Sequence, residues 1–596
     1  MATSPLANST GVLSFTITCD GAPLPDIVQV LSIETNHSTN RIPSATITVI
    51  DGDMPNAAFP VSDAGNFKPG TVVVISAGYD STVMPIFTGV VIKHSIKING
   101  DNNARLIIEC RDRALAMTVG RKNANYVEKT DNQIISTLIA AHAGLSATVD
   151  ATTVTYKELV QYYVTDWDYM MARAEANGFL VTVEAGVVSV KAPMASGSPA
   201  LTLTYGMDLI EFQAELDARW QVTSVTGTSW DLATQAIVQQ TAMPVTLTTQ
   251  GDITSATLAG VLDAGDFGLQ TAAPLESGAL TAWAKARQTK AALSRIRGRM
   301  QFQGSAVVKP GVLLELAGVG VHFNGNVIAS NVIHRLNDGN WVTEVEFGMP
   351  AYWFTEEHQL QAPEAAGWTA GMCGLHIGIV LKLDADPEGQ YKIQVSLPLM
   401  NAETVGVWAR LASFYGSSGF GAFIIPEIGD EVVLGFFNND PSCPVILGSL
   451  YSSKHVPPYE LTAQNNFKAL VTRSQLKMEF DDDKKVITLI TPGNNKIVIS
   501  DDAQSILLQD QNNNKVELGP SGILLDSPKD ITIKAQGKVT ISATQEVEVN
   551  AQADVKVAGL NINHNANVGF VAKGATTAEL SASGQTTVKG ALVMIN

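Results

Sequence analysis

Residue types that could perform hydrolytic or redox chemistry occur in this sequence, but not in the spacings that such chemistry requires. The sequence contains no Gly-x-Ser-x-Gly nucleophile elbow, no His-Glu-x-x-His zinc motif and no Cys-x-x-Cys redox pair. The adjacent carboxylates Asp430 and Glu431 stand at the start of a predicted strand, where neighbouring side chains point to opposite faces. We therefore expect turn and surface charges at these positions, no catalytic residue and no enzymatic activity.

The histidines and cysteines also lack the spacing of a metal site. The four cysteines lie far apart in the chain: Cys19, Cys110, Cys373 and Cys443. We interpret them as free thiols of a protein made in a reducing cytosol. His564 stands alone, and three copies could meet on the axis of a trimer, but a solvent-facing or hydrogen-bonded histidine is the preferred interpretation. We expect no bound metal and no cofactor.

The strongest pattern in the chain is an eight-residue repeat over residues 531–562, ITIKAQGK, VTISATQE, VEVNAQAD and VKVAGLNI. Apolar residues at the first and third positions, with a small residue at the fifth, indicate a β-strand with one dry face. One octad is a strand and a turn, and four octads are too few for a stable single-chain solenoid. We therefore predict a prism of three chains; an antiparallel meander of short strands is the alternative.

The predicted trimer core consists of the first and third residues of the octads. These are Ile531, Ile533, Val539, Ile541, Val547, Val549, Val555 and Val557. Eight-residue spacing resumes at Leu580 and Val588 after an irregular stretch, residues 563–578. Three apolar chain ends lying side by side would form an exposed plate, which usually marks a partner site. The residues of this predicted site are Leu592, Val593, Met594, Ile595 and Asn596; closure of the last coil is the alternative.

Length and composition indicate a globular protein of several domains. A chain of 596 residues is too long for one core, and 45% hydrophobic with 16% charged residues is typical of globular proteins. The 49 glycines and few helical runs favour β structure. A net charge of −18 argues against nucleic acid or an anionic membrane as the main partner. We expect neither a signal peptide nor a membrane-spanning segment.

Residues 1–195 are predicted to form a first β domain with two inserted helices. The first helix opens with the capping-box pattern TDNQ at residues 130–133, and the second opens at Thr165 and closes at Gly178. The second helix carries an apolar stripe with helical spacing: Trp167, Met170, Met171 and Ala174. We interpret this stripe as a packing face.

Three further domains are predicted downstream. Residues 196–365 continue the β character with one amphipathic helix around residues 280–294. Residues 366–460 contain five short strands, which suit an OB-type barrel, and the many acidic residues there argue against binding of nucleic acid. Residues 461–596 hold the octads and the chain end.

The order of these parts resembles the VgrG and phage baseplate-V family of spike proteins. PEIGDEVVLGFF and NNDPSCPVILGSLYSS resemble the OB domain of that family. Upstream, TDWDYMMARAEANGF, LDARW and WVTEVEFG resemble its hub region, and the octads with the ending KGALVMIN resemble its needle. The resemblance covers nearly the whole chain. It implies a mainly β protein with two barrel-like hub domains, an OB-fold collar and a C-terminal trimeric β-helix needle.

What the resemblance implies about function is a homotrimeric central spike of a contractile phage-tail-like injection machine. Such a spike links the baseplate and inner tube to the puncturing tip and pierces the target envelope mechanically. The implied partners are a PAAR-type tip protein, inner tube and baseplate proteins, effector cargo and, transiently, the target envelope. The protein would be made in the bacterial cytoplasm and assembled at the baseplate of a virion-like or extracellular particle. A trimeric β-helical adhesin or a polysaccharide-processing tail protein is the alternative.

Overall fold

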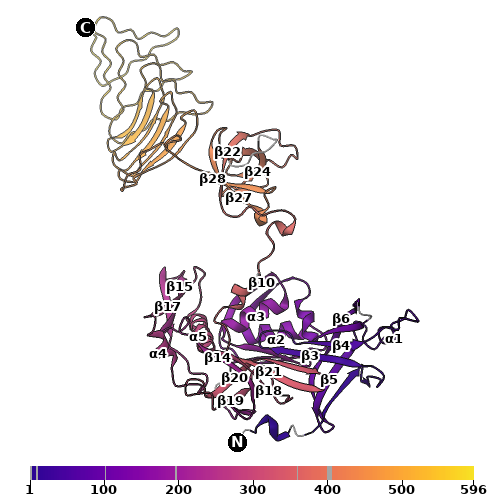
Figure 1. Cartoon of the computed structure of the whole chain (residues 1–596). Coiled ribbons are helices and arrows are strands. Elements are labelled where there is room, and N and C mark those ends of the chain that lie inside the picture. The colour runs from indigo at the N-terminus through magenta and orange to yellow at the C-terminus, as the bar shows by residue number, and fades with distance from the viewer. Residues whose placement is uncertain are drawn as a thin grey trace. The chain divides into compact units, whose positions relative to one another are not determined.

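The computed structural model describes residues 3–8, 11–100, 103–194, 197–358, 360–398 and 406–595. The chain divides into two compact units, Met1–Leu450 and Tyr451–Asn596, which are described separately below. The first unit is built mainly of β-strands and contains a closed five-stranded barrel, and the second contains a seven-stranded sheet followed by extended chain without strands (Figure 1). The predicted mainly β fold class is confirmed. Among the helices described, none is both long and apolar enough to cross a membrane.

A 13-stranded sheet is the centre of the first unit. Its main path runs through β14 (Leu209–Leu216), β18 (Ile296–Gln303), β21 (Asn340–Phe347), β20 (Gly325–Asn337), β3 (Val30–Ser38), β4 (Ser44–Ile50), β7 (Ala104–Arg111), β6 (Thr82–Ile98), β5 (Val72–Tyr79), β1 (Leu13–Cys19) and β2 (Ala22–Pro23). Two further strands, β13 (Thr202–Thr204) and β19 (Leu313–Ala317), join it through β20. Because side chains alternate along a strand, each strand sends every second residue into the core, as Ala45, Ile47 and Val49 of β4 do.

The sheet contains strands from both predicted hub segments. β20 pairs with β3, and Val332 lies opposite His37. The predicted boundary at residues 195 and 196 lies outside the described residues, so the division into residues 1–195 and 196–365 stays a prediction.

Two helices predicted from capping signals are present in the first unit. In α2 (Asp131–Ala140) the backbone N–H of Thr130 donates to Gln133 Oε1 at 3.1 Å, which completes the capping box. In α3 (Asp166–Ala176) the N–H of Asp168 donates to Thr165 Oγ1 at 3.1 Å. The predicted stripe of α3 is buried: Trp167, Met170, Met171 and Ala174. Its interpretation as a packing face is confirmed.

Smaller elements surround the large sheet. α5 (Ser277–Ser294), which covers the helix predicted around residues 280–294, lies against a three-stranded sheet of β15 (Ser224–Asp231), β16 (Ala236–Ala242) and β17 (Asp266–Gln270) (Figure 1). Two further sheets comprise β8 (Lys122–Thr130) with β10 (Thr155–Val164), and β9 (Ser146–Val149), β11 (Leu180–Glu184) and β12 (Val187–Lys191). The short helices are α1 (Pro60–Asp63), α4 (Ser255–Ala259), α6 (Phe354–Glu357), η1 (Pro5–Asn8), η2 (Arg113–Thr118), η3 (Glu364–Gly367) and η4 (Phe437–Asn439).

The five strands predicted in the third segment close into a barrel. The strands are β22 (His376–Lys382), β23 (Ile393–Ser396), β24 (Val407–Leu411), β28 (Pro444–Ser449) and β27 (Glu431–Phe436), in this order around the barrel. The barrel interior is filled by buried aliphatic side chains, including Val380, Val395 and Leu434. A two-stranded hairpin of β25 (Gly416–Ser417) and β26 (Phe420–Gly421) lies between β24 and β27 in sequence. The geometry is that of the predicted OB-type barrel.

The second unit begins with an antiparallel sheet of seven strands, which was not predicted from the sequence. The strands follow one another in sequence: β29 (Phe467–Val471), β30 (Lys477–Asp481), β31 (Val486–Ile490), β32 (Lys496–Ser500), β33 (Ser505–Gln509), β34 (Lys515–Gly519) and β35 (Gly522–Asp526). Each strand pairs only with its neighbours in sequence, so the whole ladder is formed within one chain.

The octads follow this sheet as extended chain without strand pairing. Residues 531–562, all of them described, take part in no backbone–backbone hydrogen bond within the single chain. The chain bends at the sixth and seventh positions of the first three octads, residues 536–537, 544–545 and 552–553. These bends are the predicted corners between strands.

The eight-residue period also continues through the stretch that was expected to be irregular. Further bends lie at residues 567–568, 575–576, 583–584 and 591–592. These bends come one residue earlier in the chain than steps of eight from the first three bends would place them. The shift of one residue occurs near Leu560. The irregularity over residues 563–578 is therefore one of residue type, since the backbone bends there keep a spacing of eight. The side chains there change type while the backbone spacing persists.

Candidate functional site

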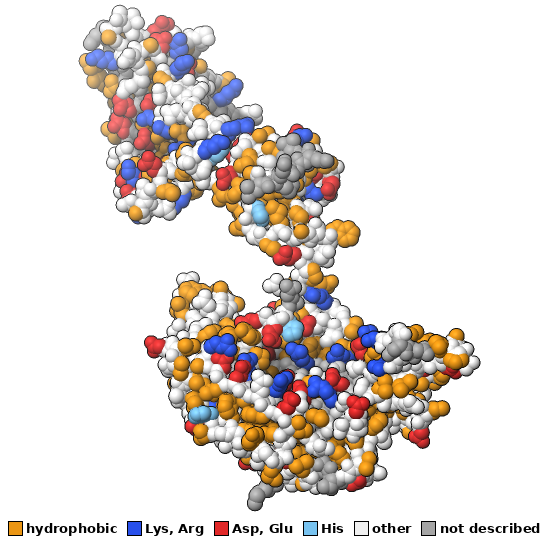
Figure 2. All heavy atoms as spheres, viewed as in Figure 1, with side chains coloured by type: hydrophobic (Ala, Val, Ile, Leu, Met, Phe, Trp, Pro, Cys, Tyr) orange, Lys and Arg blue, Asp and Glu red, His pale blue; other side chains and the backbone are white. Residues whose placement is uncertain are grey.

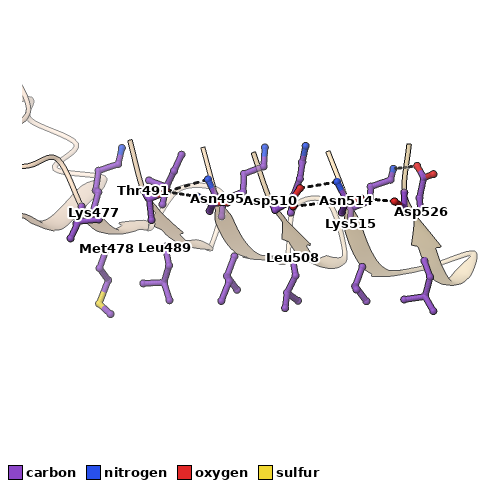
Figure 3. A pocket seen from close by; sticks show the side chains of 18 of the residues that line it. Lys477, Met478, Leu489, Thr491, Asn495, Leu508, Asp510, Asn514, Lys515 and Asp526 are labelled. Atoms are coloured by element: carbon purple, nitrogen blue, oxygen red, sulfur yellow. Dashed lines mark hydrogen bonds and ion pairs between the residues drawn. The ribbon is translucent and has the colours of Figure 1, made fainter. Parts of the chain in front are cut away.

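The seven-stranded sheet carries an apolar face, in which the strand register aligns side chains into two rows. The first row contains Leu470, Met478, Leu489, Ile497, Leu508, Val516 and Leu525, and the second contains Lys468, Phe480, Ile487, Ile499, Ile506, Leu518 and Ile523. Figure 3 shows Met478, Leu489 and Leu508 projecting from the same side of the sheet. Leu489 is 37% exposed and Ile499 is 44% exposed. An exposed apolar patch of this kind usually marks an interaction surface.

The opposite face of the sheet, named the charged face below, holds lysines at equivalent positions of alternate strands, Lys477, Lys496 and Lys515. In Figure 3, Lys477 and Lys515 point to the side opposite Met478 and Leu508. Aliphatic residues stand between the charges on this face: Val498, Leu507 and Leu524. On the apolar face the only charged residue of the two rows is Lys468, at one end, so this is the face better suited to burial against a partner.

Two lysines of the charged face, Lys477 and Lys515, form ion pairs within the single chain. Lys477 Nζ lies 2.8 Å from Glu479 Oε2, and Lys515 Nζ lies 3.5 Å from Glu517 Oε2. Desolvation acts to raise the pKa of Glu479, but hydrogen bonds from Lys477 and Tyr459 outweigh it and hold this pKa below its ordinary value. These ion pairs need no partner chain, and they are suited to contact with water.

The turns on one edge of the sheet recur at equal intervals along the chain, and this recurrence is named the turn repeat below. Thr472, Thr491 and Asp510 each accept a hydrogen bond from the backbone N–H four residues further on, at 3.1, 3.3 and 2.9 Å. The residue before that donor is left-handed in each turn, with φ of 64° at Gln475, 65° at Asn494 and 67° at Asn513.

Two of these turns are also linked, because the N–H of Gln511 donates to Asn495 Oδ1 at 3.0 Å. The turn repeat was not predicted from the sequence. Its signal is the recurrence of an Asn-x-Lys pattern, with asparagine at residues 494 and 513, lysine at residues 496 and 515, and an earlier lysine at residue 477.

The predicted trimer-core residues are exposed in the single chain. Their exposed fractions lie between 52% and 75%; the residues are Ile531, Ile533, Val539, Ile541, Val547, Val549, Val555 and Val557. Burial of these side chains requires atoms from other chains, so their assignment to a trimer core stays a prediction.

The predicted partner site at the chain end is also exposed. Val593 is the least exposed of its described residues, at 47%, and the others are Leu592, Met594 and Ile595. Asn596 lies outside the described residues. The assignment of these residues to a tip-protein site stays a prediction.

The positions considered for chemistry are Asp430, His564 and the four cysteines. Asp430 Oδ2 accepts a hydrogen bond from the N–H of Glu427 at 2.9 Å and belongs to a turn, as expected. The ring of His564 lies 6.0 Å from that of Phe570. The four cysteines are free, Cys19 and Cys110 being buried and Cys373 and Cys443 exposed. Within the described part of the chain, no three His, Cys, Asp or Glu side chains gather as they would around a metal ion.

Charges are mixed on the surface of the first unit. On the face that Figure 2 shows, Lys and Arg side chains are interspersed with Asp and Glu rather than gathered in one basic patch. A nucleic-acid backbone is normally bound by a concentrated positive surface, which this face does not offer.

Two histidines, His37 and His334, line one cavity of the first unit, together with Phe87 and Lys309. His334 is buried, and its Nδ1 lies 3.0 Å from Thr343 Oγ1. Burial lowers the pKa of His334 to about 3 and that of His37 to about 4. Both imidazoles are therefore neutral in the folded protein at physiological pH.

We expect the first unit to lose stability as the pH falls from about 6.5 to about 4. In this window the unfolded histidines, with an ordinary pKa of 6.5, bind protons that the folded ones do not. Each histidine then lowers the free energy of unfolding by roughly 1.4 kcal/mol per pH unit. Denaturant unfolding at a series of pH values measures this slope.

The variant His334→Gln should take up about one proton fewer on unfolding between pH 6.5 and 4, so its free energy of unfolding should depend less on pH. Glutamine retains a side chain that can form a hydrogen bond with Thr343. His322→Gln is the matched control, because the side chain of His322 is 54% exposed. An unchanged slope in the His334 variant between pH 6.5 and 4 would contradict the prediction.

Two family models match the chain. Residues 9–338 match the model described as Alg8 N-terminal domain. Residues 376–451, which contain the five-stranded barrel, match the model described as Type VI secretion system/phage-baseplate injector OB domain.

Individual relatives match over short segments. The type VI secretion system spike protein VgrG4b of Pseudomonas aeruginosa is 39% identical over 66 residues, which are 11% of this chain and 8% of that protein. The actin cross-linking toxin VgrG1 of Vibrio cholerae is 32% identical over 80 residues, 13% of this chain and 7% of that protein. The chain thus matches less than a tenth of the length of either relative.

Solved structures of distant likeness include a tail protein of Neisseria meningitidis, with a TM-score of 0.43 and 13% identity over 57% of this chain and 98% of that chain. The Escherichia coli c3393 protein, described as a component of the type VI secretion system, has a TM-score of 0.38 and 14% identity over 73% of this chain and 99% of that chain. At these TM-scores the likeness supports no argument about function.

Proposed function

This chain belongs to the Alg8 N-terminal domain family and carries the OB domain of VgrG-type spikes, and we propose that it is the homotrimeric central spike of a contractile, phage-tail-like injection machine. The observation that carries this proposal is the order of its parts. An injector-type OB barrel is followed by a long C-terminal unit whose apolar side chains are exposed at regular intervals. The proposed action is mechanical and non-enzymatic, without a cofactor.

A trimer accounts for the two unsatisfied features of the octads. Their apolar residues are exposed, and residues 531–562, although described throughout, form no backbone hydrogen bonds to one another. Three parallel chains would bury the apolar positions along a shared axis and pair the extended segments with one another. A closed prism also leaves no strand edge from which the needle could be peeled under load.

The proposed partners follow from this arrangement. The first unit would meet the baseplate and the inner tube, and the needle would carry a PAAR-type tip protein at residues 592–596. Effector cargo and transient contact with the target envelope belong to the same proposal. We place synthesis in the bacterial cytoplasm and assembly at the baseplate of an injection particle, which agrees with the description of the matched OB domain as an injector.

The mass of the purified full chain in solution tests the proposal. Light scattering is expected to give three times the mass of one chain, which is 63.2 kDa. Electron microscopy of particles from the producing cells should place this chain at the centre of a baseplate. A stable monomer would refute the spike. Carbohydrate turnover by the purified chain would favour the polysaccharide-processing alternative.

Removal of residues 594–596 is expected to abolish binding of the tip protein while leaving the trimer intact. Met594 and Ile595 are both exposed, and a flexible thioether adapts well to a partner surface. Co-purification with the tip protein should fall at least tenfold, and light scattering should still report a trimer. The variant Lys556→Ala, far from the end in sequence, is the control and should bind normally. Unchanged capture of the tip protein by the shortened chain would show that the plate is not the binding site.

A further inference from the structure

We propose that the seven-stranded sheet, residues 467–526, is the element through which three copies of this chain associate and by which they bring their octads into register. The inference rests on the trimer of the proposed function and assigns its formation to this sheet rather than to the octads. The occupant of the apolar face is a second copy of the chain. Three observations carry the inference: the hydrogen bonding, the composition of the face and the turn repeat.

The sheet can form before the chains meet, whereas the octads cannot. Every strand from β29 to β35 pairs with its neighbour in sequence, and the connecting turns are short. Such local pairings form quickly, because little chain entropy is lost in closing short loops. In the described chain, residues 531–562 have no backbone partner of their own. The first surface that a single chain can offer to another copy is therefore the apolar face.

The chemistry of the apolar face fits a second copy of itself. Lys468, on the first strand of the sheet, is the one charged residue of its two rows, and it pairs with Asp482, while the charged face carries Lys477, Glu479 and Lys515. An elongated apolar partner is therefore required, and another copy supplies one with rows of the same length and spacing. Three sheets joined through their apolar faces would form a prism with the charged faces in water.

The apolar face also runs into the predicted octad interface. A shallow groove along one edge of the sheet is lined by the first row of the apolar face, by Lys477, Lys496 and Lys515 of the charged face, and by Ile531 beyond β35. Figure 3 shows side chains of this groove on both faces of the sheet. Ile531 is the first of the predicted trimer-core residues, and it follows shortly after β35 ends at Asp526. When a second copy binds along this groove, the octads of the two chains therefore begin next to each other.

The turn repeat determines which residues of equivalent strands lie on each face of the sheet. It places Lys496 and Lys515 on the charged face and Ile497 and Val516 on the apolar face of strands that are two positions apart in the sheet. Since side chains alternate along a strand, a shift of one residue would exchange the two faces. The three chains therefore share one register, and their octads begin level with one another.

The test compares substitutions in the full chain by mass in solution. Leu489→Lys places a charge in the middle of the apolar face and is expected to convert the trimer to monomer, with at least a hundredfold rise in the dissociation constant. Thr488→Lys, one residue away on the charged face and opposite Glu479, should remain a trimer. Val549→Asp, in the octads, should also remain a trimer, with faster amide hydrogen exchange confined to the octads. Circular dichroism checks that the Leu489 variant keeps its strands.

An internal deletion provides a second variant. Removing residues 496–514 deletes one full turn repeat, so that Lys515 and Val516 replace Lys496 and Ile497 on their respective faces. This chain should remain a trimer with a needle shorter by about 10 Å, the width of two strands. Removing residues 496–513 instead brings Lys515 to the place of Ile497 on the apolar face, and should abolish the trimer.

The outcomes separate this inference from the proposed function. If the unchanged full chain is a monomer, the spike itself is refuted. If it is a trimer that Val549→Asp dissociates and Leu489→Lys leaves intact, the octads drive association, and only the role of the sheet is overturned. If both deletions behave alike, the register set by the turn repeat is overturned.

Discussion

Truncation of the chain after Tyr459 is expected to convert the trimer into a monomer or a weakly associating species. The truncation removes the apolar face of the seven-stranded sheet and all the octad core residues, whose exposed side chains the proposed trimer would bury. What remains is the first unit, whose 13-stranded sheet and closed barrel already have buried cores within one chain. The residues of these cores are buried without association.

Mass photometry at nanomolar concentration measures the result directly. The full chain should be a trimer under these conditions, and the truncated chain should be a monomer. A second truncation after Lys529, which keeps the seven-stranded sheet, serves as the control and should remain a trimer. A tight trimer formed by residues 1–459 would show that the first unit suffices for association and that the needle only extends it.

The variant Glu175→Gln is expected to destabilise the first unit by about 3–5 kcal/mol, the loss typical of breaking a buried ion pair. Glu175 Oε1 lies 2.6 Å from Lys290 Nζ, and Glu175 Oε2 accepts a hydrogen bond from the N–H of Phe354 at 2.6 Å. The two side chains are only 6% and 11% exposed. Lys290 also donates to the carbonyl oxygen of Tyr352 at 2.9 Å, so the pair joins α3, α5 and the start of α6. Glutamine removes the charge of residue 175 and leaves the Lys290 ammonium buried without its counter-ion.

Denaturant unfolding of the full chain, followed by a signal from the first unit, measures this loss. The matched control is Glu184→Gln, because Glu184 pairs with Lys309 at the surface and is 57% exposed. An exposed pair contributes about 0–1 kcal/mol, so this variant should unfold close to the unchanged protein. Equal unfolding midpoints for the two variants would show that the buried pair contributes no more than the exposed one.

Several parts of this protein follow from its sequence alone, because their signals lie within a few residues of one another. The capping box at Thr130 and Gln133 sets the start of α2, and the spacing of Trp167, Met170 and Met171 marks the buried side of α3. The strands of the OB barrel and the corners of the first octads follow in the same way from alternation and from turn residues. Local periodicity reports local geometry, because each residue's direction depends on its immediate neighbours in the chain.

The candidate site was only partly predictable from the sequence. The octads were recognised because similar residue types recur every eight positions. The seven-stranded sheet before them was missed, because its turn repeat is carried by backbone geometry at Gln475, Asn494 and Asn513 more than by identical side chains. The continued bends at residues 567–592 were missed for the same reason: the backbone keeps its spacing there while the side chains vary.

Other features depend on contacts between distant parts of the chain, and no local pattern encodes them. β20 pairs with β3, so that Val332 lies opposite His37, and the sequence does not record which strand is the neighbour of which. The ion pair of Glu175 and Lys290 joins residues 115 positions apart. Each of the two resembles an ordinary surface charge in its local sequence, because burial and partnership are properties of the packed elements around them. The folded chain brings these groups together when its apolar faces are buried, and their energies exist only in that arrangement.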